Sequence, residues 1–328
     1  MKKNIQKLIV LLLLLTLVFV GCSTDVADSN ENNMENDNIE LNGDSSYPRE
    51  IVDGYGNKIV IEEKPERLIT TIPSQTDILF ALGTEDNIVA ISDYCDDYGH
   101  ALERIGGYKN LNINIEKIID LEPDIVFVYG EGDEDAIRQI ESVGITTVKY
   151  ELESINQVME TITSIGQILD KERKAEEIVN ELLLKKEEVL EKIKDVETKK
   201  VFYEVWHEPL MAAGPDSFID ELITLAKGEN IAYDAEDGYA IFSVEALVDR
   251  NPEVYLVPAN HVQDFDIMTK EIVDEIVEEI KNRPGYSEID AIKNNRIEIL
   301  EPNIVSRPGI KIMDAFEMIA RAIHPEVF

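Results

Sequence analysis

The side chains best suited to holding a ligand are polar and aromatic residues that directly follow short β-branched runs of the sequence. Ser74 and Gln75 follow one such run, and Tyr129 ends another. Aromatic rings offer large rigid surfaces, and a few fixed polar groups orient a flat or bulky organic molecule. We therefore predict a binding site for such a molecule. Its predicted residues are Ser74, Gln75, Tyr94, Tyr98, Tyr108, Tyr129, Trp206, His207, Tyr239 and Arg307.

Any one of these aromatic residues could instead belong to the hydrophobic core. The set as a whole favours a binding site, because its members fall at the carboxyl-terminal ends of predicted strands. In open α/β sheets, that edge is where ligands bind. Trp206, the only tryptophan of the chain, is the leading candidate.

Motifs for enzyme chemistry are absent from the sequence. It has no Walker-type phosphate loop, no dinucleotide fingerprint, no H-E-x-x-H and no nucleophile elbow. Cys95 is expected to pack in the core, with a ligand contact as the alternative. We predict no catalytic residue, no resident metal and no cofactor. The dispersed histidines, which are expected at the surface or in a cleft, are His100, His207, His261 and His324.

Parallel strands covered by helices must position these residues. Short apolar runs alternate with helical periods, and continuous apolar strands are typical of sheets that are covered on both faces. This alternation predicts an α/β fold with parallel sheets. The predicted strands are Leu68–Ile72, Ile88–Ile91, Ile125–Tyr129, Thr147–Tyr150, Val201–Val205, Val254–Val257 and Arg296–Leu300.

The sequence also contains an ungapped internal match. Asn114–Val128 aligns with Ser243–Val257, and each copy begins with a residue type that favours a helix N-cap. Each predicted helix breaks at a proline, Pro123 or Pro252, which leads into a buried strand. The copies lie too far apart for a solenoid repeat, so the match predicts two similar lobes in tandem.

Glu116 and Glu245 occupy the same place in this match, two residues after the predicted N-cap. One interpretation is structural, because a carboxylate near a helix N-terminus is favoured by about 0.3–1 kcal/mol. The symmetric occurrence supports a second interpretation, in which two exposed acids dock a partner of two-fold symmetry.

A long helical stretch separates the two copies. One helical period continues to Asp170, and a second runs from roughly Lys171 to Lys194. About 24 residues at 1.5 Å each give about 36 Å of helix, enough to cross from one lobe to the other. We expect a stiff connection and lobes that rock by small angles.

The N-terminus has the pattern of an export signal. A cationic start is followed by an apolar run of about thirteen residues, too short to span a bilayer. The run ends before Cys22, which resembles the lipidated cysteine of a bacterial lipobox; the alternative is a common signal peptide with an incidental cysteine. The predicted organisation is a signal peptide at 1–21, a lipidated and disordered acidic tether at 22–46, lobes at 47–152 and 197–328, and a helical segment at 153–196.

Charge excludes two classes of partner. The chain has 67 acidic and 31 basic residues and a formal net charge of −36. Such a field repels nucleic acid and anionic lipid headgroups. We expect a monomer that contacts the membrane through its lipid alone.

Several segments resemble the iron-chelate and cobalamin family of periplasmic-type binding proteins, which serve ABC importers. The similarity runs from about Tyr47 to Phe328. It is carried by Asp53–Asn57, Pro65–Ile69, Asn114–Val128, Ala213–Asp220, Gly228–Ala232, Arg307–Gly309 and His324–Glu326.

The resemblance implies two Rossmann-like lobes joined by one long rigid helix, with the ligand in the cleft between them. It also implies that a glutamate on each lobe meets arginines of a permease dimer, and these positions map onto Glu116 and Glu245. The expected cargo is a metal chelate of the ferric siderophore, haem or cobalamin class. The loop from Asp93 to Tyr98 is similar to that of cobalamin binders, although it has an extra residue and Gly99 in place of the usual proline.

Anionic ferric catecholates need several arginines in the cleft, and the sequence offers Arg307 with Lys311 nearby. We therefore expect a corrinoid or a near-neutral iron chelate, including haem-like rings. Two alternatives of other classes stay open at this point. One is a two-lobed α/β enzyme, such as a chelatase that acts in the cleft, and the other is an adhesion or sensor lipoprotein that uses its acidic surface.

Overall fold

The computed structural model of the chain describes residues 47–95, 102–108, 111–130, 132, 134–259 and 269–328. Ser45–Phe328 forms one compact unit. The predicted signal peptide and tether lie outside the described residues, as do Cys22, Tyr98, His100 and His261.

The first sheet is parallel throughout, which confirms the expected α/β class. Its strand order is β5-β4-β3-β8-β9, and every neighbouring pair is parallel. The strands are β3 (Leu68–Thr70), β4 (Ile88–Ile91), β5 (Glu103–Arg104), β8 (Ile125–Tyr129) and β9 (Thr146–Tyr150). Two hairpins accompany it, β1 (Arg49–Val52) with β2 (Lys58–Ile61) and β6 (Gly106–Tyr108) with β7 (Leu111–Ile113).

The second sheet is mixed. Its order is β13-β11-β10-β14-β15, with β12 also paired to β10. The strands β12, β10, β14 and β15 pair in parallel, whereas β11 and β13 are antiparallel additions. The connection from β10 to β11 is Glu208-Pro209, and two residues can join only antiparallel strands. The strands are β10 (Lys199–His207), β11 (Leu210–Ala213), β12 (Gly228–Asn230), β13 (Tyr239–Ile241), β14 (Val254–Pro258) and β15 (Ile297–Leu300).

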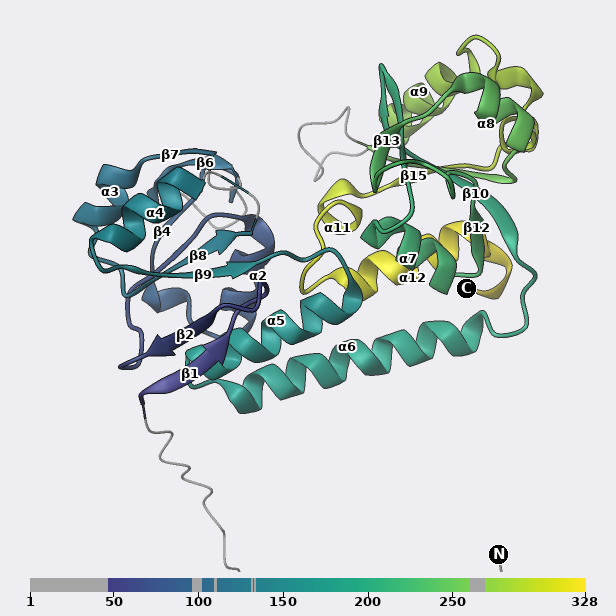
Figure 1. The fold of residues 1–328 in the computed structure, drawn as a ribbon. Coiled ribbons are helices and arrows are strands. Elements are labelled where there is room, and N and C mark those ends of the chain that lie inside the picture. Colours follow the sequence, from purple (N-terminus) through teal and green to yellow (C-terminus); the bar gives the residue numbers. More distant parts are fainter. Residues whose placement is uncertain (1–46, 96–101, 109–110, 131, 133, 260–268) are drawn as a thin grey trace, which may run out of the picture. The chain divides into compact units, whose positions relative to one another are not determined.

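Helices connect these strands and cover the sheets (Figure 1). Those of the first lobe are α2 (Pro73–Ala81), α3 (Ile115–Asp120) and α4 (Glu134–Ser142). Those of the second lobe are α7 (Phe218–Leu225), α8 (Val244–Arg250), α9 (Lys270–Lys281), α10 (Asp290–Lys293), α11 (Pro302–Val305) and α12 (Ile312–Ile323). Within the described ranges, none is long and apolar enough to cross a membrane.

Two packed helices, α5 (Ile155–Ile168) and α6 (Glu172–Lys192), run between the lobes. The break between them falls at Asp170, whose φ of 60° ends the first helix. At 21 residues, α6 is about 31 Å long, and it packs on α5 and on α12 (Figure 1). Lys185 on α6 pairs with Glu317 on α12 at 3.2 Å. The predicted crossing helix is therefore present, while its stiffness stays a prediction.

One buried apolar cluster continues through both lobes. It runs from Phe127 of β8 through Ile165 of α5 and Ile178 of α6 to Phe316 of α12. Two further apolar clusters cover the other face of each sheet. One lies around Val126 in the first lobe, and the other lies in the second lobe. Because close-packed interiors resist deformation, this shared core supports the expectation of small movements between the lobes.

The internal match of the sequence is a structural repeat. The side chains of Asn114 and Ser243 accept the backbone N–H three residues later, at 2.9 and 3.0 Å, and so cap α3 and α8. Each helix is followed by a residue of left-handed conformation at the same position, Glu122 with φ of 47° and Asn251 with φ of 48°. Each copy then enters a fully buried parallel strand, β8 or β14.

Candidate functional site

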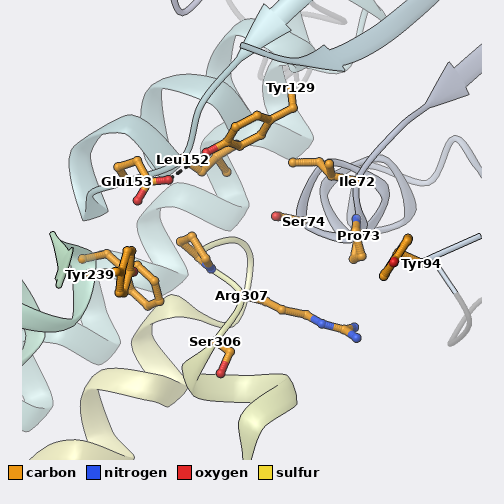
Figure 2. Close-up of a pocket in the computed structure, with 12 residues that line it drawn as sticks. Ile72, Pro73, Ser74, Tyr94, Tyr129, Leu152, Glu153, Tyr239, Ser306 and Arg307 are labelled. Carbon is orange, nitrogen blue, oxygen red and sulfur yellow. Dashed lines mark hydrogen bonds between the residues drawn. The ribbon is translucent and has the colours of Figure 1, made fainter. Parts of the chain in front are cut away.

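A cavity of ≈ 410 Å³ is lined by residues of both lobes (Figure 2). The first lobe contributes the start of α2, the last residue of β8 and residues after β4 and β9. The second lobe contributes the start of α7, the start of β13 and the loop between α11 and α12. The lining residues are Ile72, Pro73, Ser74, Tyr94, Tyr129, Leu152, Glu153, Phe218, Tyr239, Ser306, Arg307 and Pro308.

Half of the residues predicted to bind a ligand line this cavity. Ser74 and Tyr129 are nearly buried, at 8% and 6% exposed, whereas Tyr94 is 55% exposed. Tyr239 and Arg307 come from the second lobe, so the predicted set brings both lobes to one cavity. Convergence of aromatic and polar groups in this cavity suits an organic ligand.

Gln75 does not line the cavity. It lies one residue further around α2, and its side chain is directed into the protein interior. Its side chain is fully buried, and its Nε2 donates to the carbonyl oxygen of Val128 at 3.0 Å. Gln75 therefore ties α2 to β8. Its Oε1 has no hydrogen-bond partner among the described residues.

Trp206 and His207 also lie off this cavity. The predicted strand ended at Val205, but β10 continues to His207 and turns into the β11 hairpin. Trp206 is 45% exposed, its Nε1 donates to the carbonyl oxygen of Glu208 at 3.0 Å, and its ring lies 5.3 Å from that of His207. Tyr108 lies in the β6–β7 hairpin, and its side chain is outside what the structure describes.

The structure adds two carboxylates that the sequence prediction missed. The Tyr129 hydroxyl lies 2.9 Å from Oε1 of Glu153 and 3.1 Å from Oε1 of Glu151. Burial, then the negative charges of Glu153 and Glu151, raise the pKa of Tyr129 far above its ordinary value. The Tyr55 hydroxyl donates in turn to Glu151. Glu151 and Glu153 directly follow β9, so the rule that identified the other residues could have found them.

A neighbouring cavity of ≈ 370 Å³ shares Glu153 and is lined by further acids. Its other carboxylates are Asp216, Asp220 and Glu221. Glu221 accepts the backbone N–H of Ile155 at 2.9 Å and so caps α5 from the second lobe. Within the part of the chain that the structure describes, no group of three or more His, Cys, Asp or Glu residues is placed to hold a metal ion.

His324 corrects one expectation, because it is fully buried and not at the surface or in the cleft. Its Nε2 lies 2.9 Å from the carbonyl oxygen of Ala226, so it joins the end of α12 to the end of α7. Cys95 is also fully buried, with its Sγ 3.3 Å from Oγ1 of Thr76 and 3.4 Å from Oγ of Ser92. This placement fits the packing role predicted for Cys95.

Glu116 and Glu245 are both exposed, on the first turns of α3 and α8. The burial pattern over residues 114–120 is the same as that over 243–249. The two carboxylates therefore have matching local settings, one on each lobe. A docking role for them stays a prediction.

The chain matches the family model described as periplasmic binding protein over residues 68–304. It is 27% identical over 325 residues to YvrC, an uncharacterized ABC transporter substrate-binding lipoprotein of Bacillus subtilis, covering 97% of this chain and 96% of that one. A vitamin B12-binding protein of Vibrio cholerae is 22% identical over 255 residues, which cover 77% of this chain and 87% of that one.

Among solved structures, a possible iron-binding, periplasmic solute-binding protein of Staphylococcus epidermidis matches with a TM-score of 0.67 at 28% identity. The match covers 80% of this chain and 100% of that one. These similarities are to binding proteins and give no support to the alternative of a two-lobed enzyme.

Proposed function

Because the chain belongs to the periplasmic binding protein family, we propose that it captures a metal chelate outside the cytoplasm and delivers it to the permease of an ABC importer. The ligand is of the ferric siderophore, haem or cobalamin class. Relatives named for vitamin B12 and for iron support this choice. The protein acts by binding and carries out no reaction on its ligand.

The observation that carries this proposal is the cavity that residues of both lobes line. Tyr129 from the first lobe and Tyr239 from the second both line it. A ligand held there contacts both lobes at once, as capture requires. The proposed ligand-binding residues are Ser74, Tyr94, Tyr129, Tyr239 and Arg307.

Docking to the permease uses the two exposed glutamates of the repeat, Glu116 and Glu245. A permease dimer presents the same surface twice, and a repeated carboxylate on each lobe matches that symmetry. Lipid on Cys22 anchors the protein, followed by a tether at 22–46 and by lobes at 47–152 and 197–328.

A titration of the purified protein tests the capture proposal. Cyanocobalamin, haemin, a ferric hydroxamate and a ferric catecholate are added separately, and Kd is measured by calorimetry. At least one should bind at a ratio of one to one. Changing Tyr239 to Ala should weaken that ligand about tenfold, because a ring that contacts the ligand is removed.

The matched control is Trp206→Ala, an aromatic residue of the same lobe and of similar exposure that lies off the cavity. Its Kd should stay within about twofold of the wild type. Equal weakening by both variants would place the ligand elsewhere. Binding of none of the four chelates would contradict the proposed ligand class.

A further inference from the structure

A second hollow, the second-lobe recess, adjoins the main cavity. It measures ≈ 320 Å³ and is lined by residues of β10, α7, β13, β14 and the end of α11. Phe218, Tyr239 and Ser306 line both hollows, so the two meet at these residues. Figure 2 shows Tyr239 and Ser306 on the second-lobe side of the main cavity. A group attached to a ligand in the main cavity therefore has the recess beside it.

The rest of the recess is lined mainly by apolar side chains. Its remaining residues are Tyr203, Val205, Ile219, Pro258 and Val305. Three of them are almost fully buried, with Tyr203 at 3% exposed, Ile219 at 2% and Val305 at 0%. None of the described residues that line the recess carries a charge, whereas Glu153 and Arg307 line the main cavity. Removing apolar surface from water is favourable, so a hollow of this kind prefers an apolar group.

The recess lies at the strand end where the two copies of the repeat differ. Pro258 is the last residue of β14 and lines the recess, and its counterpart in the first copy is Tyr129. Proline is much smaller than tyrosine, so this strand end leaves space that a larger side chain would reduce. An apolar cavity of about 150 Å³ holds a benzene molecule, and the recess has about twice that volume.

Resting on the proposed function, we propose that the second-lobe recess is a subsite for an apolar substituent of the chelate held in the main cavity. The substituent is an alkyl chain or a single aromatic ring, because either fits the volume and meets an apolar lining. The ligand is therefore a chelate of two parts, a polar metal-binding part and an apolar arm. Phe218 and Tyr239 lie where the two parts join.

Toluene tests the recess without any chelate. Its binding to the purified protein is titrated by saturation-transfer NMR, and the wild type should bind it saturably. Val205→Phe places a ring at a half-buried position of the recess and should weaken toluene binding about tenfold or more; Val205→Leu should weaken it less. The matched control Val179→Phe makes the same change at a half-buried position of α6 outside both hollows, and toluene binding should stay unchanged.

Two series of chelates test the apolar arm. Ferrioxamine B is acylated with an acetyl, butanoyl or hexanoyl group, and cobalamin carries an axial methyl, propyl or pentyl group. Within each series only the chain length changes. For a series that binds, affinity should rise about fourfold for each CH₂ group that is buried, and this rise should disappear in Val205→Phe. Thermal unfolding of all variants, followed by circular dichroism, checks that they fold.

The outcomes separate the two proposals. If the wild type binds no member of either series and none of the four chelates of the capture titration, the proposed function fails and this inference fails with it. If it binds a chelate but no toluene, or if Val205→Phe binds toluene as tightly as the wild type, the subsite alone is overturned. The same holds if a series binds with an affinity that does not rise with chain length. A bound chelate, together with toluene binding that Val205→Phe weakens, supports the subsite.

Discussion

The two copies of the repeat share their secondary structure and differ at the last residue of the strand. Both have a capped helix, a left-handed residue and a buried parallel strand. At the last position of the strand, the first copy has Tyr129 and the second has Pro258. Tyr129 lines the main cavity with a hydroxyl held by two glutamates, whereas Pro258 lines a smaller apolar recess beside it.

This difference separates the scaffold from the site. Caps and strand burial determine the fold, so both copies need them. An asymmetric ligand needs different groups from each lobe, and the strand end of the first copy supplies Tyr129. The exposed glutamates stay symmetric, which is what a two-fold partner requires.

The largest predicted effect concerns packing that supports the second copy. Glu204 is buried on β10, next to β14, and pairs with Arg283 at 2.6 Å. Changing Arg283 to Met leaves that carboxylate buried without its cationic partner, although the Tyr255 hydroxyl still donates to it, and this should cost about 3–5 kcal/mol of unfolding free energy. Chemical denaturation measures it. The control is Arg138→Met on α4 of the first lobe, where the pair is exposed and worth at most about 1 kcal/mol. Equal losses of unfolding free energy in the two variants would contradict the stabilising role assigned to the Glu204–Arg283 pair.

The second prediction tests whether the two symmetric glutamates dock the permease. The double change Glu116→Ala and Glu245→Ala should lower uptake about tenfold or more and lower it further than either single change. Ligand affinity and thermal stability should stay near the wild type, because both side chains are exposed. A control pair at the exposed Glu160 and Glu187 should transport normally. Lost ligand affinity with unchanged binding to the permease in reconstituted membranes would assign the glutamates to the ligand site.

The third prediction tests whether the two copies of the repeat are energetically equivalent. Removing either cap, by Asn114→Ala or Ser243→Ala, should cost about 1 kcal/mol, because each side chain satisfies one helix N–H. The two losses in denaturation free energy should be similar. A loss confined to one variant would show that the copies are not energetically equivalent.

The smallest predicted effect is a pH dependence from the second lobe. Burial, and then the charge of Lys199, lower the pKa of His324 below its ordinary value of 6.5. The folded state then binds the proton more weakly than the unfolded state. This contribution to stability is complete above pH 6.5 and is lost as the pH falls towards the lowered pKa. Unfolding at pH 7.5 and 5.5 should show a smaller decline for His324→Gln than for the wild type. An unchanged decline would contradict this role.

Much of the scaffold could be predicted from sequence because its signals are local. The strand Ile125–Tyr129 was predicted with the observed bounds, and both N-caps were identified from residue type. The antiparallel strands β11 and β13 were missed because they are short and depend on tertiary pairing. The domain boundaries and the lipid anchor stay predictions.

The site was less predictable because it depends on where each strand stops and which way each side chain turns. Trp206 was expected just beyond a strand, but β10 continues through it. Ser74 and Gln75 are adjacent, yet a turn of about 100° per helical residue directs one to the cavity and the other into the core. Glu153 was missed although it follows a correctly predicted strand.

Native mass spectrometry of the protein purified from its own host, combined with elemental analysis, tests the central claim most directly. The account predicts one bound molecule per chain with a metal in a fixed ratio, displaced from a Tyr239→Ala variant. A metal-free solute, such as a sugar or a peptide, bound at that ratio and displaced by the same variant would contradict it.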